Sequence, residues 1–199
     1  MSTPPAGYGP ATALIVVDAQ NDFASPAGSL YVEGGEALIP LINAEVERAT
    51  RDGSPVFYTQ DWHPAVTPHF QAMGGVWPTH CVGGTGGAEL HSELVVAGPV
   101  VRKGVGGEDG YSGFTVRDPE RGTVLPTELV GLVASSGARD LVVTGLAGDH
   151  CVKATALDGR ALGYGVTVPL GLTRFVNLEP GDDDRAVAEM RRAGVVLTN

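Results

Sequence analysis

The sequence predicts an α/β fold in three layers, α/β/α, with a mostly parallel, doubly wound sheet of about six strands. Three observations indicate this class. Short runs of β-branched residues recur along the chain, these runs do not alternate with polar residues, and amphipathic helical patterns lie between several of them. A strand without alternation is covered on both faces, and strands that alternate with helices form a parallel sheet with right-handed crossovers.

Several segments have the composition of buried strands. The first, residues 13–17, reads ALIVV and ends at Asp18. The others are residues 55–59, 99–102, 140–145, 165–170 and a short segment at 195–197.

Helical patterns occupy residues 36–51, 126–136 and a last segment that begins at residue 182. In the first, apolar residues recur at helical spacing and Gly53 follows as a stop. The second opens with a proline and ends before Gly137. The third opens with three aspartates and closes with two arginines, which suits the helix dipole.

Composition indicates a single globular domain. The chain has 199 residues, 43% of them hydrophobic, and a formal net charge of −10. We expect one domain over residues 11–199 after a flexible leader at residues 1–10, which lacks the features of a signal peptide. The acidic charge disfavours nucleic acid and anionic lipid, and no apolar run approaches the roughly 20 residues that span a bilayer. We therefore expect a cytoplasmic protein with a small-molecule partner, and the sequence leaves open whether it forms a homo-oligomer.

The two cysteines, Cys81 and Cys151, are too few for a disulfide framework, so we expect free thiols. The segment 141–156 predicts a buried strand, a tight turn and then a helix, with Cys151 at or near the first turn of that helix. A helix N-terminus lowers a thiol pKa and offers N–H groups to an oxyanion. This order suits a nucleophile, although position alone is equally compatible with a buried packing cysteine.

Residues 60–98 have no clear periodicity and are rich in Gly, Pro, His and Trp. Asp61, His63, His69 and His80 lie here within twenty residues of one another. Carboxylate and imidazole ligands suit one divalent transition metal, most readily Zn, with Fe or Mn as alternatives. The segment therefore predicts a metal site.

Polar residues also follow two of the predicted strands. Asp18 ends the first, and Lys103 follows the apolar Val100 and Val101. Because ligands bind at the carboxyl ends of strands in doubly wound sheets, Asp18 and Lys103 could converge with Cys151. Taken singly, Asp18 could cap a turn and Lys103 could be a solvated strand end.

Together these segments resemble a known family. The motifs VDAQNDF at 17–23, DWHP at 61–64, WPTHCV at 77–82, KG at 103–104, YSGF at 111–114 and DHCV at 149–152 occur in this order. They are similar to those of the nicotinamidases, also called pyrazinamidases, which belong to the isochorismatase-like cysteine hydrolases. The match extends from about Leu14 to Val168, and six ordered motifs are far more specific than one.

The resemblance implies an amidohydrolase that converts nicotinamide, and also pyrazinamide, to the carboxylate and ammonia through a cysteine thioester, in NAD salvage. The residues it implies are catalytic Asp18, Lys103 and Cys151; metal ligands Asp61, His63 and His80, with His69 ranked below them; substrate contacts Phe23, Trp77 and Tyr111; and oxyanion N–H groups of Ala147 and Cys151. It also implies a cis peptide bond between Leu146 and Ala147. His150 could orient the turn before Cys151, without a chemical role.

The chain departs from the family pattern in three places. Gly148 stands where a threonine is common, residues 104–110 are unusually rich in glycine, and residues 169–174 replace a stretch that often starts with aspartate. These departures leave the implied catalytic residues intact, and they bear on pocket shape and substrate preference.

Three other functions remain as alternatives. Another hydrolase of the superfamily could act on a carbamoyl or ureido substrate, but such relatives generally lack the Asp-x-His and His metal set. An isochorismatase often lacks the cysteine. A non-catalytic metal-dependent binding module needs the histidines, but it gives no reason for Asp18, Lys103 and Cys151 to accompany them.

Overall fold

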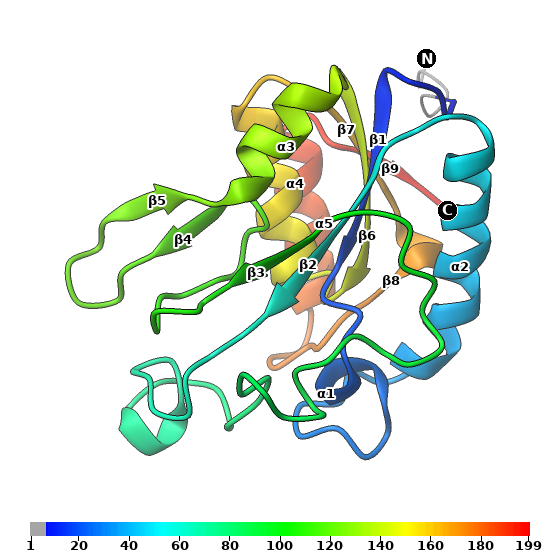
Figure 1. The fold of residues 1–199 in the computed structure, drawn as a ribbon. Coiled ribbons are helices and arrows are strands. Elements are labelled where there is room, and N and C mark those ends of the chain that lie inside the picture. Colours follow the sequence, from blue (N-terminus) through cyan, green and yellow to red (C-terminus); the bar gives the residue numbers. More distant parts are fainter. Residues whose placement is uncertain (1–6) are drawn as a thin grey trace.

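The central sheet is parallel and runs through the whole molecule (Figure 1). The computed structural model describes residues 7–199. The strand order is β3-β2-β1-β6-β7-β9, and β8 pairs with the end of β6. The strands are β1 (Thr12–Val17), β2 (Val56–Asp61), β3 (Val100–Lys103), β6 (Asp140–Leu146), β7 (Gly165–Pro169), β8 (Thr173–Arg174) and β9 (Val196–Thr198). Each predicted strand is present, which confirms the predicted fold class.

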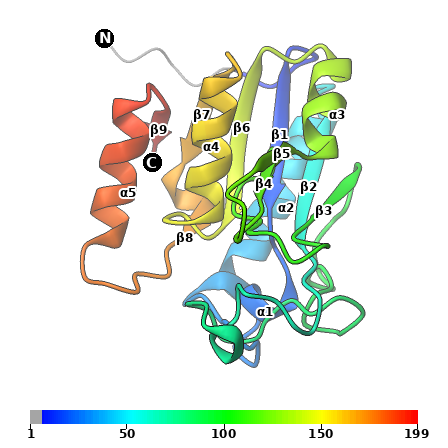
Figure 2. The same ribbon diagram turned by 90° about the vertical axis from the view of Figure 1, so that its left-hand side faces the viewer.

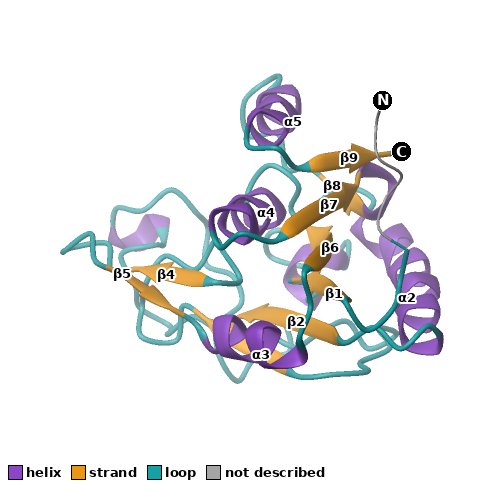
Figure 3. Cartoon of the chain, turned by 90° about the horizontal axis from the view of Figure 1, so that it is seen from above, coloured by secondary structure: helices purple, strands orange, loops and turns teal. Residues whose placement is uncertain are grey.

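Helices cover both faces of this sheet. Seen from above, α2 (Gly35–Arg51) lies on one side, and α4 (Cys151–Ala161) and α5 (Asp182–Arg192) lie on the other (Figure 3). Each face has its own apolar core: residues of α2 pack with one set of strand side chains, and residues of α3 (Glu128–Ser136), α4 and α5 pack with the alternate set. Two cores separated by a sheet are the predicted three layers.

The second predicted helix begins later than expected. Pro126 ends a short strand instead of opening the helix, and the Thr127 side chain caps α3 by accepting from the N–H of Leu129. Pro126 belongs to an antiparallel hairpin of β4 (Thr115–Arg117) and β5 (Val124–Pro126), which the sequence pattern did not predict. The strands of this hairpin have three residues each and no buried residue, so they carry no hydrophobic pattern.

Three short helical turns complete the described elements: α1 (Asn21–Ala24) and the 3₁₀ turns η1 (Gln71–Met73) and η2 (Leu170–Leu172). Leu170, expected at the end of a strand, therefore begins η2. Figure 2 shows α1 and the long segment after β2 together at one end of the sheet. That segment, residues 60–98, is mostly irregular, as its lack of periodicity predicted.

Part of the predicted leader lies outside the described residues, namely residues 1–6. Of the rest, the Tyr8 hydroxyl donates to Glu45 Oε1 at 2.7 Å, and the Gly9 N–H donates to Ser54 Oγ at 2.8 Å. Within residues 7–199, none of the helices has both the length and the apolar character that a bilayer crossing needs.

The topology places a crevice between β1 and β6. From β1 the chain builds outward to β2 and β3, and from β6 it builds in the other direction to β7 and β9. The point at which a doubly wound sheet reverses its strand order leaves a crevice at the carboxyl ends of the strands. Asp18 follows β1, and the turn before Cys151 follows β6, so both lie at this point.

Candidate active site

Asp18, Lys103 and Cys151 meet at the carboxyl ends of the strands, although they are far apart in sequence. Lys103 Nζ lies 2.8 Å from Asp18 Oδ2 and 3.8 Å from Cys151 Sγ. A carboxylate oxygen of Asp18 lies within 4.8 Å of the Cys151 sulfur. All three residues are buried. The structure thus brings together an acid or base, a cation and a thiol.

Backbone geometry brings these strand ends close together. Asp18 adopts φ of +47°, a left-handed conformation that is uncommon for a residue other than glycine and occurs often at functional sites. The Asp18 N–H donates to the Thr59 carbonyl at 3.3 Å, and the Thr59 hydroxyl donates to Asp18 Oδ1 at 2.7 Å. Gly145 has φ of +110°, and a Cβ there would lie 2.1 Å from the Val17 carbonyl oxygen. Only glycine lets β6 approach the end of β1 this closely.

Cys151 is the first residue of α4, as its position in the sequence predicted. The preceding turn contains a cis peptide bond between Leu146 and Ala147, which confirms that expectation. The Ala147 carbonyl accepts the N–H groups of His150 and Val152. Among the described residues, the N–H groups of Ala147 and Cys151 have no backbone partner outside the regular helices and strands. These two groups are therefore free to bind an anionic oxygen.

The charges around Lys103 are strongly coupled. Burial by itself favours the neutral amine, but Asp18 and Asp61 outweigh it and raise the pKa of Lys103 well above its ordinary value. Burial raises the pKa of Asp18 to about 6, against the opposing charge of Lys103. Burial also raises the pKa of the Cys151 thiol. At neutral pH the site therefore combines an ionised Asp18, a protonated Lys103 and a neutral thiol.

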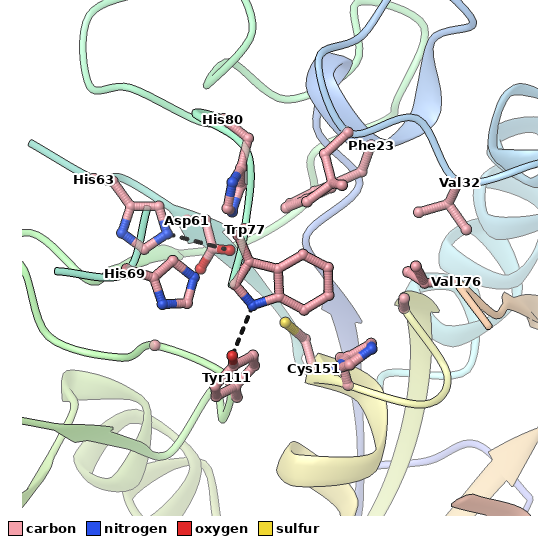
Figure 4. Close-up of a pocket in the computed structure, with 14 residues that line it drawn as sticks. Phe23, Val32, Asp61, His63, His69, Trp77, His80, Tyr111, Cys151 and Val176 are labelled. Atoms are coloured by element: carbon pink, nitrogen blue, oxygen red, sulfur yellow. Dashed lines mark hydrogen bonds and ion pairs between the residues drawn. The ribbon is translucent and has the colours of Figure 1, made fainter. Parts of the chain in front are cut away.

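The histidines of the long irregular segment form a second cluster. One ring nitrogen from each of His63, His69 and His80 lies within 4.8 Å of the others, and all three residues are buried. The rings of His63 and His69 stack with centroids 4.8 Å apart. Asp61 Oδ2 lies 3.7 Å from His63 Nε2 (Figure 4). The structure thus gathers the three predicted histidine ligands, His69 included, and Asp61 lies beside them through its contact with His63.

Hydrogen bonds leave these rings suited to metal binding. His69 Nδ1 lies 2.9 Å from Asp109 Oδ1, and His80 Nδ1 lies 2.8 Å from the Pro78 carbonyl oxygen. Each contact assigns the proton to Nδ1 and leaves the Nε2 lone pair free. Burial lowers the pKa of His80 to about 4, which keeps the ring neutral. Among described residues, both ring nitrogens of His63 are buried without a hydrogen-bond partner. Unpartnered buried nitrogens and neutral rings are what a metal requires.

A second group of potential ligands, Asp18, Asp61 and Cys151, is equally compact, but a lysine ammonium group already contacts its carboxylates. Lys103 Nζ already contacts both carboxylates, and it also donates to the Gly110 carbonyl. Its positive charge balances the carboxylates and holds the pKa of Asp61 low, although burial raises it. A metal among these three residues would be repelled by the ammonium group, so the histidine cluster is the better metal site.

One pocket joins the two clusters (Figure 4). Cys151 and the three histidines all line it, and the predicted substrate contacts Phe23, Trp77 and Tyr111 form its walls. The Trp77 Nε1–H donates to the Tyr111 hydroxyl at 2.7 Å, which fixes both rings. Asp18 and Lys103 do not line the pocket, because they are fully buried behind the thiol.

Other lining residues were not predicted as pocket contacts: Leu30, Val32, Gly110, His150 and Val176. His150 packs edge-on against Trp77 with ring centroids 4.8 Å apart, so it shapes the pocket as well as preceding Cys151. Its position next to the candidate nucleophile was the available signal. Leu30, Val32 and Val176 are ordinary apolar residues in loops, and nothing in their local sequence distinguishes them.

Comparisons with known proteins identify the family of this chain. The model of the "Isochorismatase domain" matches residues 12–199. The nicotinamidase of Escherichia coli is 35% identical over 206 residues and covers 94% of each chain. Among solved structures, PnC1 of L. infantum in complex with nicotinate superposes with a TM-score of 0.88 and 40% identity, covering 98% of this chain and 96% of that one.

A second solved structure is the pyrazinamidase of Pyrococcus horikoshii in complex with zinc. It superposes with a TM-score of 0.83 and 33% identity, covering 95% of this chain and 99% of that one. The family model thus spans the sheet, both clusters and the pocket between them. The chain belongs to the isochorismatase-domain family.

Proposed function

We propose that this protein is a nicotinamidase, which hydrolyses nicotinamide, and also pyrazinamide, to the carboxylate and ammonia in NAD salvage. One observation carries this proposal: the Cys151 thiol and three histidines line a single pocket, with Asp18 and Lys103 buried behind the thiol. The relative from E. coli is a nicotinamidase, and the L. infantum structure contains nicotinate. Both support a small aromatic carboxamide as the substrate.

The reaction begins with proton transfer from the Cys151 thiol to Asp18. The resulting thiolate attacks the carboxamide carbon, and the carbonyl oxygen becomes an oxyanion. When this intermediate collapses, the C–N bond breaks and the nitrogen takes the proton from Asp18, so ammonia leaves. Because the pKa of the thiol is raised, an ionised Asp18 within 4.8 Å is the group that supports thiolate formation.

Water completes the cycle. Asp18 accepts a proton from water as the hydroxide adds to the thioester carbon, and the thiolate then leaves and takes the proton back. In both steps the N–H groups of Ala147 and Cys151 would stabilise the oxyanion; that neither has a backbone partner among the loop and turn hydrogen bonds of the described residues supports this role. Lys103 holds the Asp18 carboxylate in its ionised form and opposes its movement.

His63, His69, His80 and Asp61 would hold one divalent metal ion, which when bound supplies a positive charge that orients the substrate. Zinc is the metal we propose, because it accepts mixed imidazole and carboxylate ligands and the P. horikoshii relative contains it. These residues lie on the side of the pocket opposite Val176, as Figure 4 shows, and Cys151 lies between. A substrate held there would present its carboxamide to the thiol.

The alternatives fit this site less well. A binding module has no use for a buried base and cation behind a thiol, and an isochorismatase has no need of Cys151. A carbamoyl or ureido amidohydrolase could use Asp18, Lys103 and Cys151, but it leaves the histidine cluster without a task.

The two buried free cysteines are compatible with the reducing cytoplasm, which stays the predicted compartment.

The test is ammonia release from nicotinamide by the zinc-loaded protein. We expect turnover by the wild-type protein and by Cys81→Ala, and none by Cys151→Ala, while metal content stays the same in all three. Cys81 is a matched control, because it is the other buried thiol and does not line the pocket. Normal ammonia release by Cys151→Ala would contradict the mechanism, and a silent wild-type protein with bound zinc would favour the binding module.

A further inference from the structure

The wall of the pocket opposite the histidines comes from the segment that follows η2, residues 173–177. Residues 173–177 overlap the end of the stretch, residues 169–174, that departs from the family pattern. Thr173 and Arg174 form β8 and pair with Gly145 and Leu146 at the end of β6. Val176 then lines the pocket together with Ala147 and Cys151 (Figure 4). The segment therefore rests directly on the turn that precedes Cys151.

Asp149 attaches this segment to the turn. Its carboxylate is buried and accepts two consecutive backbone N–H groups, from Val176 at 3.0 Å on Oδ1 and from Asn177 at 2.8 Å on Oδ2. Asn177 adopts φ of +52°, so the chain turns around the carboxylate here. Hydrogen bonds to an ionised, buried acceptor are stronger than neutral ones, and a bidentate arrangement also fixes orientation.

Gly148 provides the second attachment. Its N–H donates to the Arg174 carbonyl at 2.7 Å, and the ring of Phe175 occupies the space of a side chain at position 148. A Cβ on Gly148 would lie 2.6 Å from Phe175 Cε1, which is closer than nonbonded carbon atoms approach. The absence of a side chain at Gly148 and the presence of Phe175 are thus two parts of one packing arrangement.

We propose that Asp149 and the Gly148–Phe175 contact are positioning elements that set substrate specificity by placing Val176 against the substrate ring. This inference rests on the proposed function and extends it. Asp149 does not line the pocket, and it reaches the wall through its hydrogen bond to the backbone of Val176; His150 Nε2, at 3.8 Å from Asp149 Oδ2, is beyond hydrogen-bond distance. The substrate class that this wall selects is an unsubstituted aromatic carboxamide. A ring methyl group on the side of Val176 would collide with its side chain.

The test compares kcat/KM for nicotinamide with kcat/KM for a set of ring-methylated nicotinamides. Val176→Ala removes two methyl groups from the wall, so we expect the ratio of the best methylated substrate to nicotinamide to rise about tenfold. Asp149→Asn keeps the shape of the side chain and loses an acceptor, so we expect the ratio to move in the same direction. A variant that only lowers the amount of folded protein reduces the apparent kcat/KM of every substrate by the same factor, so it leaves this ratio unchanged.

Matched variants separate the effect of Asp149 and of the Gly148–Phe175 contact from general effects of a substitution. Asp184→Asn removes the same charge at an exposed position on α5, and we expect the ratio to stay at the wild-type value. Gly148→Ala displaces the Phe175 ring and changes the ratio, and Phe175→Leu in the same chain restores it by vacating the space. In the double variant Asp149→Asn, Val176→Ala, the change in ratio is smaller than the product of the single changes, because both act on one contact.

Hydrogen exchange gives a readout that does not depend on turnover. The amides of Val176 and Asn177 exchange faster in Asp149→Asn, while those of β1 and β6 keep their protection. Unchanged ratios and unchanged amide exchange in an active Asp149→Asn variant overturn this inference and leave the proposed function intact. A wild-type protein that does not hydrolyse nicotinamide overturns both.

Discussion

The two ends of the pocket are built in different ways. At the thiol end, Asp18, Lys103 and Cys151 lie at the termini of β1, β3 and α4, so regular hydrogen bonding and two apolar cores fix their backbones. At the histidine end, the three histidines come from the irregular segment that follows Asp61, the last residue of β2. The comparison teaches that reacting groups lie on the rigid sheet, whereas the proposed substrate anchor depends on local polar contacts.

Individual side chains replace secondary structure at the histidine end. At the last residue of β2, where the irregular segment begins, Gln20 donates to the Asp61 carbonyl and accepts the Asp61 N–H, both at 2.8 Å. Asp22 accepts the Cys81 N–H at 2.7 Å, next to His80, and the Cys81 carbonyl accepts the His63 N–H at 2.9 Å. Each such bond contributes only about 1 kcal/mol, so this end is expected to open more readily than the sheet.

The largest expected effect is at Lys103, which belongs to the thiol end and also contacts Asp61. Lys103→Met removes the cation between two buried carboxylates, and we expect turnover to disappear and the free energy of unfolding to fall by about 3–5 kcal/mol. Ammonia release and urea denaturation measure the two quantities. Arg102→Met is the control, because Arg102 is an exposed neighbour on the same strand. Equal losses in both variants would mean that the ion pairs have no special role.

Metal removal should affect the backbone of the histidine end and leave the backbone of the thiol end protected. A chelator is expected to abolish most of the turnover and to speed amide exchange across residues 62–82, while β1, β6 and α4 keep their protection. Hydrogen exchange followed by mass spectrometry measures this, and added zinc should reverse both changes. Uniform loss of protection across the sheet would show that the metal supports the whole fold, and that the ends are not independent.

The pH dependence of kcat/KM tests the thiol end alone. Burial raises the pKa of Asp18 to about 6, and Asp18 must be ionised to accept the thiol proton. Activity should therefore be retained above this value and fall as the pH decreases through it, by tenfold for each further unit. A profile measured at constant ionic strength, with metal content checked at each pH, gives the acid limb. A flat profile between pH 5 and about 7 would exclude Asp18 as the base.

The smallest expected effect is at Thr59, whose hydroxyl donates to Asp18 Oδ1 at 2.7 Å. The hydroxyl donor stabilises the ionised carboxylate, and Thr59→Val removes it while keeping the shape of the side chain. The pKa of Asp18 should therefore rise, and the acid limb should move to higher pH. We expect less than a tenfold loss of kcat/KM at pH 8 and unchanged metal content. Thr67→Val, at the histidine end, should leave the acid limb in place, since Thr67 donates to the Gly107 carbonyl.

Much of the fold was predictable because its signals are local. Runs of β-branched residues predicted six strands, and helical spacing of apolar residues predicted α2. The turn residues after a strand predicted that Cys151 lies at the start of α4. Each of these signals acts within a few positions of the chain. The β4–β5 hairpin was missed because its strands have three residues each and none of these residues is buried. The start of α3 was misplaced because a proline suits both a strand end and a helix start.

The sequence by itself determined the chemistry that is available: a thiol, a carboxylate and an amine at strand ends, and three histidines with an aspartate in an irregular segment. Only the tertiary structure decided which of these groups meet, that Asp18 and Lys103 lie behind the thiol, and that His69 lies among the other histidines. It alone revealed Val176 and the contact between Gly148 and Phe175. The reason is physical: propensity and capping act between neighbours in the chain, whereas a pocket is made by contacts between residues that folding brings together from distant positions.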